Sequence, residues 1–158
     1  MKSLRVIVAD DEILTRMDLK EMLAEQGHKV VGEANNGATA LELVQKLRPD
    51  LAILDIKMDK MDGIKVAKLV TGQKICGVLL LTAYNEDELV KRALDAGVMA
   101  YLTKPVTERE LEPAIRVAWA RFQDIISLKS KKAELKETLN RDIRQAKLKN
   151  TNGAGFKK

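Results

Sequence analysis

Five short apolar runs that alternate with longer helix-like segments constrain the fold of this chain most strongly. The runs are rich in Val, Ile and Leu, as is typical of buried strands, and each precedes a segment with helical spacing of its apolar residues. The runs are 4–9, 29–34, 51–56, 78–82 and 98–103, and the helical segments are 12–26, 37–47, 62–71, 86–96 and 107 onward. Alternating strands and helices form βαβ crossovers. The pattern therefore predicts a doubly wound α/β fold with a five-stranded parallel sheet.

Polar residues stand where four of these five strands end. The first strand is followed by Asp10 and Asp11, the third ends in Asp55, the fourth in Thr82, and the fifth is followed by Lys104. Ligands of open parallel sheets bind at the carboxyl ends of the strands, where the winding reverses. With the strand order 2-1-3-4-5, the first and third strands are neighbours. We therefore expect three carboxylates, a hydroxyl and an ammonium group to share one pocket.

Three carboxylates at one place raise each other's pKa unless a cation neutralises them. Oxygen ligands without His or Cys suit a hard cation, and a site with few carboxylates suits Mg²⁺ better than Ca²⁺. Lys104 and Thr82 can hold an anion beside that metal. The set predicts a phosphoryl site, with the central carboxylate of Asp55 as the nucleophile.

Four motifs in this order resemble the receiver domain of two-component response regulators: "ADDE", "LDIKMDKMDG", "LTA" and "YLTKP". The resemblance covers residues 1–120 and implies a flavodoxin-like (CheY-like) fold in which a sensor histidine kinase phosphorylates Asp55. It implies a role for each site residue, as follows: Mg²⁺ is bound by Asp10, Asp11, Asp55 and the backbone carbonyl of Lys57; the phosphoryl group contacts Thr82, Ala83 and Lys104; Thr82 and Tyr101 form the switch; and the Lys104–Pro105 peptide is cis.

Other polar residues near these motifs are expected to stay outside the chemistry. Glu12 is expected in the first turn of a helix, where the helix dipole favours negative charge. Asp59 stands where receiver domains usually carry proline, so the loop loses a constraint and gains a charge. The single His28 is expected to be a solvated side chain, and Cys76, in "ICGVLLL", a small core residue.

A long amphipathic helix is predicted after the last strand. "TERE" at 107–110 has the form of a capping box. The apolar stripe that follows recurs at steps of three and four residues, with two consecutive three-residue steps after Phe122 that shift its phase. It contains Leu111, Ile115, Ala118, Phe122, Ile125, Leu128, Leu135, Leu139 and Ala146, with Lys132 and Asp142 at two of its positions. We predict that residues 121–149 form a coiled-coil extension that pairs two chains into a homodimer, and that residues 150–158 are disordered.

The C-terminal segment is strongly basic. From residue 121 onward the chain has eleven Lys and Arg against four acidic residues, whereas the whole chain has a net charge of +5. The stretches "VVGEANNG", "AGVMAYLTKPV" and "LEPAIRVAWARF" resemble the AmiR/NasT branch of response regulators, which implies a coiled coil leading to an RNA-binding ANTAR domain for transcription antitermination. After Arg144 the likeness fades and too few residues follow for three packed helices. We therefore expect a truncated or degenerate output region, with RNA as an open question.

Two other functions remain as alternatives. The first is an aspartyl-phosphate Mg²⁺-dependent phosphatase, which also attacks phosphate with an Asp side chain. Enzymes of that class carry the motif Asp-x-Asp on the first strand, and "ADDE" lacks this spacing. A stand-alone receiver would act through protein–protein contacts. We expect no enzyme activity beyond self-catalysed phosphoryl transfer and autodephosphorylation. No apolar run reaches the length of a membrane span and no signal peptide is recognisable, so we expect a cytoplasmic protein without a membrane partner.

Overall fold

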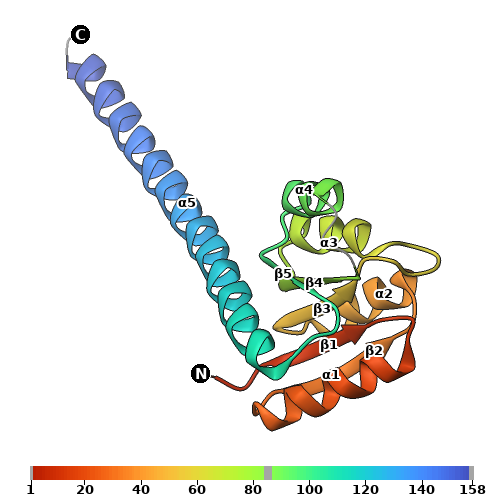
Figure 1. The fold of residues 1–158 in the computed structure, drawn as a ribbon. Coiled ribbons are helices and arrows are strands. Elements are labelled where there is room, and N and C mark those ends of the chain that lie inside the picture. Colours follow the sequence, from red (N-terminus) through yellow and green to blue (C-terminus); the bar gives the residue numbers. More distant parts are fainter. Residues whose placement is uncertain (1, 84–86, 157–158) are drawn as a thin grey trace. The chain divides into compact units, whose positions relative to one another are not determined.

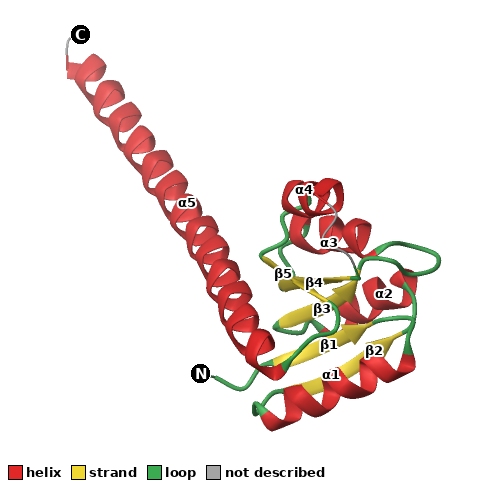
Figure 2. Cartoon of the chain, viewed as in Figure 1, coloured by secondary structure: helices red, strands yellow, loops and turns green. Residues whose placement is uncertain are grey.

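The computed structural model describes residues 2–83 and 87–156 and contains one five-stranded parallel sheet in the order β2-β1-β3-β4-β5 (Figures 1 and 2). The elements are β1 Arg5–Ala9, α1 Ile13–Glu25, β2 Lys29–Ala34, α2 Gly37–Leu47, β3 Leu51–Asp55, α3 Gly63–Gly72, β4 Gly77–Thr82, α4 Asp87–Asp95, β5 Ala100–Thr103 and α5 Glu108–Phe156. The predicted doubly wound α/β fold and its strand order are confirmed. The chain divides into two compact units, Met1–Phe122 and Gln123–Lys158, which are described separately below.

The central strands of the first unit are buried on both faces. Every residue of β3 and β4 is buried, and so is every residue of β1 after Arg5. Because a parallel sheet is covered by helices on both sides, such strands are apolar throughout instead of alternating. This explains why the sequence shows continuous runs such as "LAIL" and "VLLL".

Strand register brings the polar strand ends to one edge of the sheet. Ala9 of β1 pairs with Leu54 of β3, so the residues that follow them, Asp10 and Asp55, are neighbours. On the other side of β3, Asp55 pairs with Leu81 of β4, the residue before Thr82. The carboxyl end of β3 therefore lies between the acidic pair and the Thr82 side.

His28, expected to be solvated, is buried, so that prediction was wrong. Its ring Nδ1 accepts a hydrogen bond from the backbone N–H of Leu4 at 3.1 Å, and only 8% of the residue is exposed. Burial lowers the pKa of the imidazole. The neutral ring thus supplies the acceptor that the Leu4 amide would otherwise lack, because that amide precedes the first strand of the sheet.

We expect His28→Leu to lower the free energy of unfolding by about 1–3 kcal/mol, because the buried Leu4 N–H loses its side-chain acceptor. His28→Asn, whose amide oxygen can take the place of Nδ1, should lose less than half as much. Urea unfolding of both variants at pH 7.5 measures the difference. Equal losses would mean that the ring volume, and not its acceptor, matters.

The first turns of α5 pack on the first unit as the stripe predicts. Thr107 Oγ1 accepts a hydrogen bond from the Glu110 N–H at 3.3 Å, as in a capping box. Four stripe residues are buried there, namely Leu111, Ile115, Ala118 and Phe122. Figure 2 shows α1 and this part of α5 apart from α2, α3 and α4, which cover the other side of the sheet.

In the second unit α5 continues to Phe156, which differs from the disorder expected after residue 149. Extending an existing helix by one residue adds a hydrogen bond without a new nucleation step, so residues of low helix propensity can still follow a long helix. Lys157 and Lys158 of the expected disordered tail lie outside the described residues. None of the described helices has an apolar stretch long enough to cross a membrane.

Candidate functional site

Three carboxylates gather at the carboxyl ends of β1 and β3. Oxygen atoms of Asp10, Asp11 and Asp55 all lie within 4.8 Å of one another. Asp10 is completely buried and Asp55 is 5% exposed, whereas Asp11 is exposed. The two strand ends that the sequence places together are thus adjacent in the fold, with one carboxylate open to solvent.

Asp10 is fixed in place by its own backbone surroundings. Its Oδ1 accepts a hydrogen bond from the Glu12 N–H at 2.8 Å, and its carbonyl oxygen accepts one from the Arg16 guanidinium at 2.7 Å. Only the other carboxylate oxygen, Oδ2, is directed to the ion pair with Lys104. The site therefore rests on a carboxylate that is oriented by the start of α1.

Lys104 is the cation within this cluster. Its Nζ lies 2.7 Å from Asp10 Oδ2, 3.1 Å from Asp55 Oδ2 and 3.5 Å from Glu12 Oε1. Glu12 was expected to lie in the first helical turn, outside the chemistry. It instead precedes α1 as the N-cap residue, with extended backbone angles (φ −90°, ψ 116°), and its carboxylate is the outermost contact of Lys104.

The carboxylates strongly influence one another. Burial raises the pKa of Asp55 to about 6, and the charges of Asp10 and Asp11 add to this effect, while the Lys104 ammonium opposes it. Burial alone would lower the pKa of Lys104, but its hydrogen bond to Asp10 and the negative charges of Asp55 and Asp10 outweigh burial and raise it. One ammonium group does not neutralise the cluster, so a further cation would stabilise its ionised form.

A pocket of about 150 Å³ opens over these groups. Its lining contains most of the predicted site residues and three others, and consists of Asp11, Glu12, Asp55, Ile56, Lys57, Thr82, Ala83, Leu89 and Lys104. A water molecule occupies about 30 Å³ in the liquid, so the pocket has room for a hydrated ion or a phosphoryl-sized anion. Of the lining residues, Thr82 is buried, with 3% exposed, and Ala83 is exposed. Ile56 and Leu89 are lining residues that the sequence did not single out.

The loop after β3 is held tightly against the site. Gly63 donates its N–H to the Ile56 carbonyl at 2.8 Å, and a Cβ at Gly63 would lie 2.1 Å from the Asp55 carbonyl oxygen. The Asp59 carbonyl accepts hydrogen bonds from the N–H groups of Gly37 and Met61. Although the loop has Asp59 where receiver domains usually carry proline, backbone hydrogen bonds anchor it. The Asp59 side chain is exposed.

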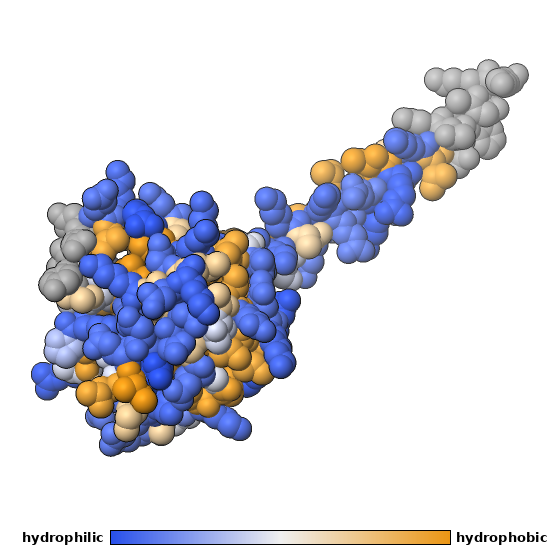
Figure 3. All heavy atoms as spheres, turned by 90° about the vertical axis from the view of Figure 1, so that its right-hand side faces the viewer, coloured by the Kyte–Doolittle hydropathy of each residue, from blue (hydrophilic) through white to orange (hydrophobic). Residues whose placement is uncertain are grey.

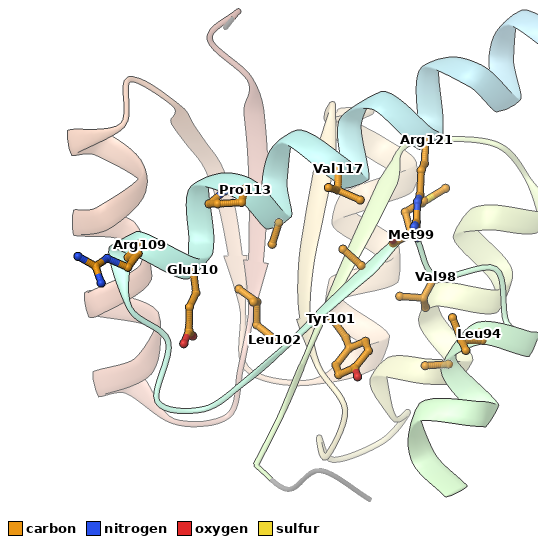
Figure 4. Close-up of a pocket in the computed structure, with 13 residues that line it drawn as sticks. Leu94, Val98, Met99, Tyr101, Leu102, Arg109, Glu110, Pro113, Val117 and Arg121 are labelled. Atoms are coloured by element: carbon orange, nitrogen blue, oxygen red, sulfur yellow. Dashed lines mark hydrogen bonds between the residues drawn. The ribbon is translucent and has the colours of Figure 1, made fainter. Parts of the chain in front are cut away.

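Tyr101, the predicted switch aromatic, lies at a different surface. It is 39% exposed and lines a larger pocket of about 680 Å³ formed by α4, β5 and the first turns of α5. Figure 4 shows its ring on the side of Leu94 and Val98, with Val117 and Arg121 at the opposite end of the lining. Arg121 is held there by a hydrogen bond from its guanidinium to the Met99 carbonyl at 2.6 Å. The structure thus brings together every predicted site residue except Tyr101. The Lys104–Pro105 peptide is cis.

Comparison with known proteins agrees with this geometry. The family model described as "Response regulator receiver domain" matches residues 6–116. The transcriptional regulatory protein PdtaR of Mycobacterium tuberculosis is 47% identical over 135 residues, covering 85% of this chain and 66% of that protein. A regulator of Pseudomonas aeruginosa is 36% identical over 119 residues, covering 75% of this chain and 58% of that protein. The chain thus spans less than two thirds of the length of these relatives.

Solved structures show the same fold. The receiver domain of NarL from M. tuberculosis is 38% identical, with a TM-score of 0.69 over 73% of this chain and 94% of that chain. CheY of Borrelia burgdorferi, solved in a complex with CheX, BeF₃ and Mg²⁺, is 25% identical, with a TM-score of 0.67 over 70% of this chain and 85% of that chain. From the matched residues and the acidic cluster at the strand ends, we conclude that this chain belongs to the response regulator receiver family.

Proposed function

We propose that a cytoplasmic sensor histidine kinase phosphorylates this chain on Asp55 in the presence of Mg²⁺, and that the output is a change in pairing of the C-terminal helix. The observation that carries the proposal is the buried Asp55 carboxylate, which lies 3.1 Å from Lys104 and shares its surroundings with Asp10 and Asp11. A nucleophile, an anion-binding ammonium and a set of metal ligands are the components that phosphoryl transfer to a carboxylate requires.

The residues present fit Mg²⁺. Receiver domains bind this ion at an acidic pocket, and here the donors are carboxylate oxygens within 4.8 Å of one another, without His or Cys. Asp10, Asp11, Asp55 and the backbone carbonyl of Lys57 would hold it. When bound, the ion supplies positive charge that offsets the carboxylates and the phosphoryl oxygens. The CheY complex of B. burgdorferi contains the same ion.

The side chains of this chain perform the transfer. A carboxylate oxygen of Asp55 attacks the phosphorus of the kinase phosphohistidine, the P–N bond breaks, and the histidine nitrogen leaves with the electron pair. Lys104 exchanges its contact with Asp55 for a phosphoryl oxygen, and the Thr82 hydroxyl donates to another oxygen. The acyl phosphate remains on Asp55 until water hydrolyses it, so the chain acts on no separate substrate.

Acetyl phosphate labelling tests the proposal. With Mg²⁺ we expect at most one phosphoryl group per chain, and none on the Asp55→Asn variant. Asp59→Asn is the matched control, because it removes an exposed carboxylate from the neighbouring loop and should label like the wild type. Repeated turnover of a soluble phosphomonoester, or labelling that survives Asp55→Asn, would instead support the phosphatase alternative or another acceptor.

We expect Lys104→Met to tighten Mg²⁺ binding at least about fivefold, because a positive charge that competes with the ion is removed from among its ligands. The same variant should accumulate less phosphoprotein, since the phosphoryl group loses its ammonium contact. Calorimetric titration with MgCl₂ measures the affinity. Lys65→Met, which removes the same charge from an exposed position on α3, should leave the affinity within about twofold.

The second unit supports helix pairing as the output. It exposes large apolar side chains to solvent, including Leu128 (65%), Leu135 (70%) and Leu139 (59%). Its basic surplus extends the proposal to RNA as a ligand of the pair, with transcription antitermination as the result. Sedimentation equilibrium with and without beryllofluoride tests the pairing, and we expect the dimer fraction to change with the phosphoryl mimic. An unchanged dimer fraction would mean that phosphorylation does not control pairing.

A further inference from the structure

The helical segment after Phe122 has an unusual seam. Apolar residues recur at alternating steps of three and four, which is the heptad spacing of a two-stranded coiled coil. The seam positions are Ile125, Leu128, Lys132, Leu135, Leu139, Asp142 and Ala146. Figure 3 shows hydrophobic residues between hydrophilic ones along this segment. Two of the seam positions therefore carry charge, one of each sign.

The two charges are placed symmetrically about residue 137. Leu135 and Leu139 lie two residues before and after residue 137. Lys132 and Asp142 lie five residues before and after it. Both charged residues are exposed. Ten residues apart on one helix, they are separated by about 15 Å and cannot pair within a chain. Within a helix pair, an opposite charge at the seam can therefore reach either residue only from another molecule.

The direction of pairing decides whether these charges attract or repel. In a parallel coil each seam residue faces its own copy, which places Lys132 against the partner's Lys132 and Asp142 against the partner's Asp142. In an antiparallel coil centred on residue 137, Lys132 faces the partner's Asp142 and Leu135 faces the partner's Leu139. Buried like charges are unfavourable and opposite charges compensate one another.

We propose that the C-terminal helix pairs antiparallel with a second copy of this chain, with the two-fold axis at residue 137 and two Lys132–Asp142 ion pairs across the seam. The inference deepens the proposed dimer output and rests on it. The positions beside the seam contribute both attraction (Asp124 to Lys129) and repulsion (Lys131 to Lys136) in a parallel coil, and these exposed contacts are screened by salt. The two seam charges, which pairing would remove from water, favour the antiparallel direction.

A charge exchange in the full-length protein tests the direction. In the antiparallel pair, Lys132→Asp places two like-charged contacts in the seam, and Asp142→Lys does the same, so each single variant should raise the dimer dissociation constant by about tenfold or more. The double variant Lys132→Asp/Asp142→Lys restores both opposite pairs and should recover wild-type affinity. In a parallel pair all four proteins have the same number of like-charged contacts and should bind alike. Sedimentation equilibrium at fixed salt and beryllofluoride measures the constants.

Disulfide trapping gives a second readout. In the antiparallel register, Leu128 faces the partner's Ala146. A mixture of Leu128→Cys and Ala146→Cys chains should therefore cross-link to each other more readily than either chain cross-links to itself. Wild-type chains are the control, since Cys76 is completely buried. Rescue by the double variant together with mixed cross-links supports the proposal.

Two outcomes overturn the proposal in different ways. Equal affinities of the four proteins with self-cross-links at Leu128→Cys would establish parallel pairing and leave the dimer intact. If the protein were monomeric under every condition, the chains would not pair at all and the proposal would fail. Neither outcome affects Asp55 labelling by acetyl phosphate, which is measured on the same protein, so failure of the phosphorylation proposal is recognised separately.

Discussion

Replacing Gly63 with alanine should lower the free energy of unfolding of the receiver unit by about 2–3 kcal/mol. The added Cβ would lie 2.1 Å from the Asp55 carbonyl oxygen and 2.9 Å from its carbonyl carbon. Both obstacles are backbone atoms at the end of a buried central strand, so no side chain can rotate away to make room. The strand end that carries Asp55 must move instead. Urea unfolding measures the loss, and a Mg²⁺ titration should show weakened binding in the same variant.

Gly72 offers a control on the same helix. A Cβ at Gly72 meets nothing within 4 Å, and alanine is a better helix former than glycine by up to about 1 kcal/mol. Gly72→Ala should therefore raise stability slightly, with no effect on Mg²⁺ binding. If Gly63→Ala were as stable as Gly72→Ala, the close approach of α3 to β3 would not constrain residue 63.

Asp55→Asn should stabilise the protein without Mg²⁺ by on the order of 2 kcal/mol at pH 8. Burial and neighbouring carboxylates raise the pKa of Asp55 to about 6, above its ordinary value of 3.8. Below pH 3.8 the carboxyl is protonated in both states and costs nothing. As pH rises from about 4 to 6, the unfolded chain loses this proton first, so the folded state is progressively destabilised. Asparagine carries no charge and avoids this cost.

The pH dependence and the metal dependence of that gain are its checks. Thermal unfolding of both proteins should show little difference near pH 4 and a full difference above pH 7. With millimolar Mg²⁺ the order should reverse, because wild type binds the ion more tightly than the variant and binding stabilises the folded state. Asp59→Asn should show neither effect. A gain that persists near pH 4 would point to packing rather than charge.

Much of the site could be predicted because strand ends are visible in the sequence. The apolar runs end abruptly at Asp10, Asp55 and Thr82, and the rule that parallel strands carry ligands at their carboxyl ends brings these distant residues together. β2, which has no such group at its end, lies at an edge of the sheet, as expected. The geometry of a parallel sheet is therefore enough to predict that these residues, which are distant in the sequence, lie close together.

Other features depend on contacts that no local pattern reports. His28 is buried because its ring meets the Leu4 amide from a segment 24 residues away, while its neighbours in the sequence are polar. Glu12, the N-cap residue of α1, reaches Lys104 from a part of the chain more than 90 residues away. Leu89 reaches the pocket over Asp55 from α4, whose direction relative to β3 is set by packing. Each required knowledge of the tertiary structure.

The ion pair of Lys104 also bears on which metal ions we expect this site to favour. Its ammonium already holds a single positive charge 2.7 Å from Asp10 and 3.1 Å from Asp55. Sodium or potassium would bring no more charge than the side chain supplies, so neither gains by entering. A divalent ion brings twice as much and can share the carboxylates with the lysine. We therefore expect a divalent ion to bind this site more tightly than a monovalent one, because Lys104 already supplies a single positive charge there.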